Sequence, residues 1–193
     1  MIQQEKFVSI KKALKKELDK ERYQHTLAVA YTACCLAMRW EADLDSAYIA
    51  GLLHDCAKNI PDEDRVKLCG KWGLPVNKTE RKNPTLLHAK MGAYLAVEKY
   101  GVDDPDILRA IEFHTTGRPG MSTLEKIIFV ADYIEPYRFK AENLTLIRYE
   151  AFVDLDCAIS RISGDTFRYL QSKEPDDIDP MTEEVFRYYT HED

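Results

Sequence analysis

The segment from Ala47 to Lys58, AYIAGLLHDCAK, carries seven residues of low polarity straight into an adjacent histidine and aspartate. A helical pattern places His54 and Asp55 towards the protein interior, where uncompensated polar groups are costly. A divalent metal ion would compensate them, because neutral imidazole and ionised carboxylate are both good ligands. The alternative is that His54 and Asp55 are adjacent by chance at an exposed helix end. If only this dipeptide were considered, the alternative would be favoured. The other helices of the chain decide between the two.

The helix that ends at His54 and Asp55 should begin at Asp43 or Asp45. Adjacent helical positions point about 100° apart, so both side chains can flank one ion beside the helix. Two ligands cannot complete the coordination shell of that ion. Lys58 follows one turn beyond His54. Further ligands must therefore come from other helices.

Two helices are expected before this segment. Apolar residues recur at helical spacing from Phe7 to Leu18, which predicts an amphipathic first helix. The second helix, roughly Arg22 to Trp40, is apolar on most sides and should be central. Arg22 and His25 are three residues apart and so share one face. A lone histidine at such a place is more often a core residue bonded to a backbone carbonyl than a ligand.

Two later segments carry the next histidines. Asn83-Pro84 has the pattern of a cap followed by proline, which predicts a helix with His88 in its early turns. Asp104-Pro105 repeats this signal, and the helix that it begins leads to His114. The loop that follows, Thr115 to Gly120, is rich in hydroxyls and helix breakers.

An acidic residue follows another apolar run. Ser122 and Glu125 have the spacing of a capping box, and the helix that they begin continues through the apolar residues 127–131 to Asp132. Pro136 marks the end of this helix. An acid placed after such a run repeats the pattern of His54 and Asp55.

The remainder of the chain is also expected to be helical. A long helix is predicted from about Asn143 to Leu170, followed by a solvated acidic connector at residues 174–177. Asp179-Pro180 should begin a short last helix, and His191 in the tail is assigned no role. Since strand-like alternation is absent, the prediction is an all-α fold, a single domain spanning residues 1–193.

The composition limits the compartment and the partners. The chain has 193 residues, of which 45% are apolar and 31% charged, and a formal net charge of −6. This acidic balance argues against a general binder of DNA, RNA or anionic membranes, and an anionic substrate would need local cations. No window approaches the roughly 18 apolar residues of a membrane span, and no signal peptide is seen, so a cytoplasmic protein is expected. Five cysteines without C-x-x-C spacing suggest neither a disulfide framework nor a zinc ribbon, and most should be reduced thiols in or near the core.

The candidate ligands thus stand on separate predicted helices. A bundle in which these helices converge would form a cluster of imidazoles and carboxylates able to hold one or two metal ions. The candidates in chain order are His25, His54, Asp55, His88, His114 and Asp132. Their spacing alone is a weak signal, because they are spread over more than a hundred positions.

Five motifs make the pattern specific. They are RYQHT at residues 22–26, GLLHDCAK at 51–58, LLHA at 86–89, HTTGRP at 114–119 and ADYIEP at 131–136. Their order resembles the HD superfamily of metal-dependent phosphohydrolases. More closely, the chain resembles the YqeK family of bacterial symmetrical bis(5′-nucleosyl)-tetraphosphatases.

This resemblance implies an HD-domain helical bundle over about residues 20–138, with a C-terminal helical extension over about 140–190. It implies an iron enzyme that cleaves diadenosine tetraphosphate into two ADP. By position in the motifs, the expected metal ligands are His25, His54, Asp55 and Asp132. The residues expected to contact the phosphates or complete the site are Arg22, Lys58, His88, His114, Thr115 and Arg138.

We expect four of these residues to act in catalysis, namely Asp55, Lys58, His88 and His114. His25 and Asp132 are expected to meet the substrate as well as the metal. The resemblance leaves open whether His88 and His114 hold a second ion or contact phosphate, and it assigns no residue to the base.

The metal and the substrate each have alternatives. Mixed nitrogen and oxygen ligands fit Fe, Mn, Co, Ni or Zn about equally on chemistry alone, so iron follows from the resemblance. A dinucleoside polyphosphate is the expected ligand, and a homodimer is possible. The rival enzyme acts on another nucleotide, such as a nucleoside mono- or triphosphate or a cyclic nucleotide. A rival of another class is a non-catalytic nucleotide sensor, which the complete set of ligand positions argues against.

Overall fold

The computed structural model describes residues 2–173 and 178–190, and within these ranges the chain forms helices and no strands. The prediction of an all-α fold is confirmed. The helices are α1 (Ile2–Glu17), α2 (Lys20–Arg39), α3 (Leu44–Leu53), α4 (Asp62–Trp72), α5 (Lys78–Lys82), the 3-10 helix η1 (Pro84–Leu87), α6 (His88–Glu98), α7 (Pro105–Glu112), α8 (Thr123–Ile134), α9 (Leu144–Glu150), α10 (Leu155–Lys173) and α11 (Pro180–Thr190).

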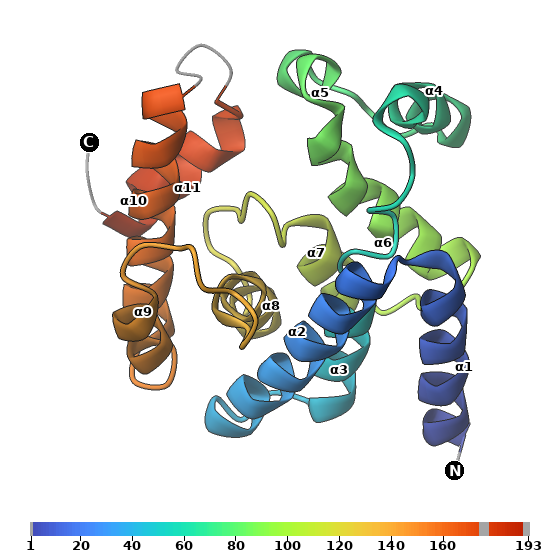
Figure 1. Ribbon diagram of the computed structural model, residues 1–193, viewed down its shortest axis with the longest axis horizontal. Helices are drawn as coiled ribbons and strands as arrows, with labels where there is room; N and C mark the ends of the chain where they lie inside the picture. The colour runs from blue at the N-terminus through green and yellow to red at the C-terminus, as the bar shows by residue number, and fades with distance from the viewer. Residues whose placement is uncertain (1, 174–177, 191–193) are drawn as a thin grey trace.

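Helix α8 occupies the middle of the molecule. It packs against α2, α3 and α7 on one side and against α9 and α10 on the other, with α11 held on α10 (Figure 1). One hydrophobic cluster runs through this arrangement from Ile10 in α1 to Tyr189 in α11. A smaller cluster of Ala57, Cys69, Leu87 and Met91 joins α4 to η1 and α6. The C-terminal helices therefore share a core with the helices that carry the candidate ligands.

Small residues let α3 lie directly on α2. Gly51 faces Ala30, and a Cβ atom built at Gly51 would stand 2.6 Å from the Cα atom of Ala30, closer than real atoms approach. Ala30 and Ala33 of α2 are fully buried at this contact. The close approach brings the helix of His25 beside the end of the helix that precedes His54.

Most predicted helix starts are confirmed by their caps. The Asp43 side chain accepts a hydrogen bond from the Ser46 amide, so α3 is capped by Asp43 and not by Asp45. Ser122 and Glu125 form the reciprocal capping box at the start of α8, as the sequence predicted. These contacts satisfy amide groups that the first turn of a helix leaves without partners.

The prediction of a helix capped by Asn83 is wrong in detail. The Asn83 side chain makes no capping hydrogen bond, and Pro84 begins the 3-10 turn η1. His88 is consequently the first residue of α6. The sequence analysis also missed α5, which begins with a capping box formed by Asn77 and Glu80.

The predicted long helix from Asn143 to Leu170 is two helices. Two side chains at the C-terminal end of α2 donate hydrogen bonds to the carbonyls where α9 ends: Trp40 Nε1 to Ala151 O at 2.9 Å, and Arg39 Nε to Phe152 O at 2.7 Å. The Asp154 carboxylate then accepts hydrogen bonds from the amides of residues 156 and 157 at the start of α10. The local pattern missed this break because its partners lie over a hundred residues away.

The remaining expectations have mixed outcomes. Asp179 accepts from the Met181 amide at the start of α11, as predicted, whereas the acidic connector at 174–177 and His191 lie outside the described residues. All five cysteines are free, and Cys35 and Cys157 are exposed rather than near the core. Among the described residues, no helix has the length and apolarity needed to cross a membrane.

We predict that Gly51→Ala destabilises the protein by about 1–3 kcal/mol, because the new methyl group overpacks the α2–α3 contact. Gly70→Ala is the matched control, since a Cβ at Gly70 would meet no atom within 4 Å and alanine favours the interior of α4. Urea denaturation of both variants checks this. Equal midpoints for the wild type and Gly51→Ala would contradict the close packing.

Candidate metal centre

Three helices bring a first group of ligands together. The Nε2 atoms of His25 in α2 and His54 at the end of α3 lie 3.3 Å apart. His25 Nε2 is 3.0 Å from Asp132 Oδ1 of α8, and His54 Nε2 is 3.5 Å from Asp55 Oδ2. The same group was predicted as the metal ligands.

A second group uses the other oxygen of the same carboxylate. Asp55 Oδ1 is 3.2 Å from His88 Nε2 and 3.7 Å from His114 Nε2. The two imidazole nitrogens are themselves 3.2 Å apart. Asp55 thus stands between two groups of imidazoles, with one oxygen turned to each.

Backbone carbonyls decide where the imidazole protons are. The Nδ1 atoms of three rings lie 2.5–2.8 Å from a carbonyl oxygen three residues earlier, in the pairs His54–Gly51, His88–Thr85 and His114–Ile111. A carbonyl can only accept, so Nδ1 carries the proton in each neutral ring. The Nε2 atoms therefore point their lone pairs into the cluster.

Glu135 plays the same part for His25. Its Oε1 atom lies 3.3 Å from His25 Nδ1, and its Oε2 atom accepts from the Tyr137 amide at 2.6 Å. The carboxylate is buried, and it leaves His25 Nε2 free to act as a ligand. Glu135 lies within the ADYIEP motif, and no role was predicted for it from the sequence; its position at the end of α8, just before Pro136, was the available signal.

The charges around the cluster set its protonation. Burial opposes ionisation of Asp55, but His54, His114 and His88 around it hold the pKa of its carboxyl well below the ordinary value. Burial likewise works against the charge of Asp132, but a hydrogen bond from a proton on His25 Nε2 outweighs it and lowers the pKa of the carboxyl; a bound metal ion would displace that proton. Burial lowers the pKa of His88 to about 4. Near neutral pH the centre therefore offers ionised carboxylates and a neutral His88.

These donors fit a divalent metal ion. Asp55 Oδ1 is buried and has no hydrogen-bond partner among the described residues. In two sets of three residues the ligand atoms lie within 4.8 Å of one another. One set is His25, His54 and Asp55 of the first group, and the other is the second group, Asp55, His88 and His114. Atoms that each bond one ion at about 2.0–2.2 Å have separations of this order. A cation would relieve the opposed lone pairs in both groups.

Cationic side chains border the ligands. Arg22 Nη1 lies 2.6 Å from Asp55 Oδ2, and Arg138 Nη2 lies 3.5 Å from Asp132 Oδ1. Lys58 Nζ is 3.2 Å from His88 Nε2, and burial lowers the pKa of its ammonium group. Positive charge is thus concentrated here in a chain whose net charge is negative.

The structure places all ten candidate residues in one region. Thr115 completes the set, since its Oγ1 atom lies 3.3 Å from His88 Nε2 and 3.2 Å from His114 Nε2. His54 lies at the end of its helix as expected, whereas the helix expected to lead to His114 ends two residues before it. His54 follows the last residue of α3 and His114 lies beyond α7, where free carbonyls of the helix end can fix the rings.

Two arginines outside the ligand groups hold the segments that carry them. Buried Arg65 donates to Lys58 O at 2.8 Å and to Thr85 O at 3.1 Å, the carbonyl that also orients His88. Arg148 of α9 donates to Glu135 O at 2.8 Å and to Arg138 O at 3.0 Å. Sequence reasoning missed both, because an arginine that bonds distant carbonyls has no local signature.

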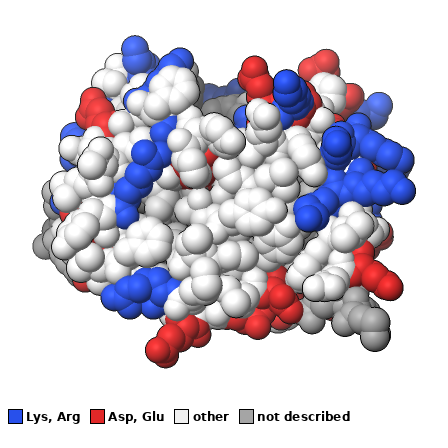
Figure 2. Space-filling view, turned by 60° about the horizontal axis from the view of Figure 1, so that its bottom comes forward, with Lys and Arg blue, Asp and Glu red and all other residues white. Residues whose placement is uncertain are grey.

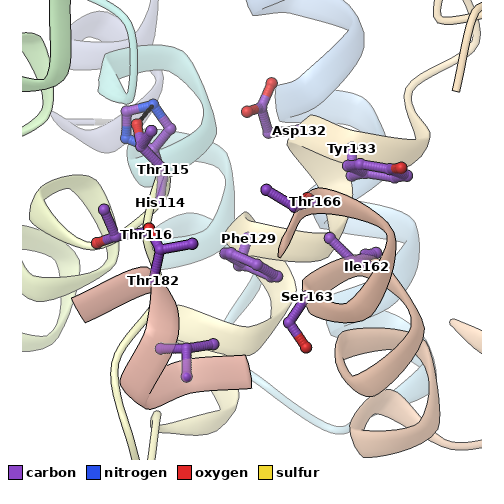
Figure 3. A pocket seen from close by; sticks show the side chains of 11 residues that line it. His114, Thr115, Thr116, Phe129, Asp132, Tyr133, Ile162, Ser163, Thr166 and Thr182 are labelled. Carbon is purple, nitrogen blue, oxygen red and sulfur yellow. Dashed lines mark hydrogen bonds between the residues drawn. The ribbon is translucent and has the colours of Figure 1, made fainter. Parts of the chain in front are cut away.

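Two cavities are lined by candidate metal ligands, each by different ones. One, shown in Figure 3, has Asp132 and Tyr133 on one side and His114 with Thr115 on the other. The second is an open hollow lined by Arg22, His25 and the aromatic and cationic tract at residues 137–140. The centre is therefore accessible to a ligand larger than a metal ion.

Comparison with known proteins agrees with this geometry. The family model for the HD domain matches residues 22–137. Proteins named "Bis(5'-nucleosyl)-tetraphosphatase, symmetrical" from Bacillus subtilis and Halalkalibacterium halodurans are 42% identical over 160 residues, which cover 83% of this chain and 85% and 84% of those proteins. The protein of the same name from Staphylococcus aureus is 34% identical over 185 residues, covering 95% of this chain and 94% of its own.

A solved structure has the same fold. It is described as the crystal structure of a predicted HD superfamily hydrolase involved in NAD metabolism from Clostridium acetobutylicum. Its superposition gives a TM-score of 0.91 at 39% sequence identity, covering 96% of this chain and 97% of that one.

We predict that Glu135→Gln weakens metal binding about 10–100-fold, because the amide lacks the charge that raises the basicity of the His25 ring. Competition for the metal against a chelating indicator measures this. Glu98→Gln, the same change on an exposed residue of α6, should leave the affinity unaltered. Equal affinities for both variants would show that Glu135 does not support the ligand.

Proposed function

Because the chain belongs to the HD domain family, and within it to the symmetrical bis(5′-nucleosyl)-tetraphosphatases, we propose that it is a metal-dependent hydrolase that cleaves diadenosine tetraphosphate into two ADP. The observation that carries the proposal is the carboxylate of Asp55, which faces one group of imidazoles with each oxygen. The names of the relatives support a dinucleoside tetraphosphate substrate and symmetrical cleavage, and the YqeK resemblance supports adenosine as the nucleoside.

The proposed metal ligands are His25, His54, Asp55 and Asp132. A second ion would be held by Asp55, His88 and His114; with one ion, these two histidines would instead meet the phosphates. When bound, a divalent metal polarises phosphoryl oxygens and makes water a stronger nucleophile at neutral pH. The YqeK resemblance favours iron, while Mn, Co, Ni and Zn suit the same donors.

The chain's own side chains would orient the substrate and the water. Asp132 is the more accessible carboxylate, with 24% of its side chain exposed against 3% for Asp55, so it is the better placed to orient the attacking water. Arg22, Lys58 and Arg138 would balance the charge of the polyphosphate. Losing one such contact in a transition state costs about 3 kcal/mol. Thr115 adds a hydroxyl beside the histidines.

A product assay tests the reaction. Metal-loaded protein should convert diadenosine tetraphosphate into ADP alone, because cleavage at the central anhydride leaves two phosphates on each nucleoside. Chromatography of the products distinguishes this from AMP plus ATP. Intact dinucleotide beside a hydrolysed mononucleotide would favour the rival HD nucleotidase or phosphodiesterase.

A variant separates the enzyme from a nucleotide sensor. Asp55→Asn should lose its metal and reduce turnover at least about 10²–10³-fold, because it removes the charge between the two imidazole groups while keeping the side-chain shape. Elemental analysis and a rate assay measure both effects, and circular dichroism checks the helices. Asp103→Asn, on an exposed loop, is the control. Full turnover by a metal-free Asp55→Asn protein would defeat the proposed centre.

The proposal extends to organisation and partners. We propose one domain, in support of which a single hydrophobic cluster joins α1 to α11, and a cytoplasmic location. A second copy of the chain is a proposed partner; one face of the molecule carries few charged side chains at its centre and both signs around it (Figure 2), which suits self-association. That DNA and RNA are not ligands stays a prediction from the charge.

A further inference from the structure

The cavity of Figure 3 lies between the ligand-bearing helices and the C-terminal helices. On one side of it Asp132 and Tyr133 of α8 lie near Ile162 and Thr166 of α10, and on the other side His114 lies near Thr182 of α11. The cavity volume is about 60 Å³, the space of a few water molecules. The residues of α10 and α11 lie outside the range matched by the HD model. A segment beyond the HD domain thus closes a cavity that begins at the proposed metal ligands.

A larger hollow lies next to this cavity. It has a volume of about 710 Å³, is partly open to solvent, and shares Tyr133 and Thr166 with the cavity as lining residues. Its other lining residues include Arg138, Lys140 and Tyr169 together with the carboxylates of Glu142 and Asp165. Tyr133 and Thr166 therefore border both hollows.

The lining changes character from the cavity to the larger hollow. Beside the ligands it combines the rings of Phe129 and Tyr133 with hydroxyls of α10 and α11. Farther out, the Arg138 guanidinium lies 5.6 Å from the ring centroid of Tyr133. Flat apolar surface, hydroxyls and cations together suit a base, a ribose and a phosphate, whereas inorganic phosphate alone would need no aromatic wall.

Symmetrical cleavage needs two exits from the centre. The central anhydride must lie at the metals, so a nucleoside with its phosphates has to extend away on each side. The open hollow at Arg22 and His25 offers one exit, and the cavity at His114 and Asp132 offers another. The exposed rings of Tyr137 and Phe139 border the first exit.

We propose that the two-part cavity walled by α10 and α11 binds one nucleoside of the dinucleotide. This inference rests on the proposed function. It assigns the C-terminal helices a direct part in recognising the substrate, with Thr166 on the wall that both parts share.

The test is calorimetric binding to metal-loaded protein, with ADP and inorganic pyrophosphate as probes. Thr166→Phe should fill space beside the shared wall and weaken ADP binding about tenfold, or remove one of two bound ADP equivalents. Pyrophosphate, which lacks the nucleoside, should bind with unchanged affinity. Thr166→Leu is the milder variant if phenylalanine disturbs folding, with a smaller effect in the same direction. Gln171→Phe, on an exposed position of α10, is the control and should bind both probes as the wild type does.

Unchanged ADP binding by Thr166→Phe would overturn the inference. An equal loss of ADP and pyrophosphate would also overturn it, because the substitution would then act on the phosphate site. The two proposals fail in different ways, since binding is measured without turnover. Protein that binds ADP through Thr166 but leaves diadenosine tetraphosphate intact would refute the reaction and leave the cavity assignment standing.

Discussion

The buried carboxylate of Asp55 is the constraint on which the rest of the centre depends. Each of its oxygens faces the Nε2 atoms of a pair of imidazoles, and Oδ1 accepts no hydrogen bond. Opposed lone pairs and an ionised acid are costly to bury unless positive charge compensates them. Arg22 supplies some of that charge from one side. A metal ion in each group would supply the remainder, so the arrangement makes physical sense as a ligand set.

Helix ends make this ligand set possible. His54 and His114 each follow the last turn of a helix, where carbonyls without intrahelical partners can accept a hydrogen bond from Nδ1–H. Glu135 does the same for His25 from the end of α8. Arg65 and Arg148 then bond the carbonyls of the turns that bear Lys58, His88, Glu135 and Arg138, so the site rests on fixed backbone. Orientation of the ligands is thus secured by groups that touch neither metal nor substrate.

The C-terminal helices add a second level of organisation. They pack on α8, the helix that delivers Asp132, and extend the hydrophobic core beyond the range of the HD model. The same packing leaves a cavity that is lined both by residues of the centre and by residues of α10 and α11. The packing of the C-terminal helices on α8 therefore both extends the hydrophobic core and sets the shape of the cavity.

The sequence by itself determined the helical class, most helix starts and the identity of the candidate ligands, because periodicity, caps and motifs are local properties of the chain. Asp104 and Ser122 cap their helices as predicted for this reason. Only the tertiary structure decided the break between α9 and α10, the roles of Glu135, Arg65 and Arg148, and the division of the ligands into two groups that share Asp55. Each of these depends on partners from 7 to more than 100 residues away, and no local pattern encodes which carbonyl or imidazole a side chain will meet once the helices have packed.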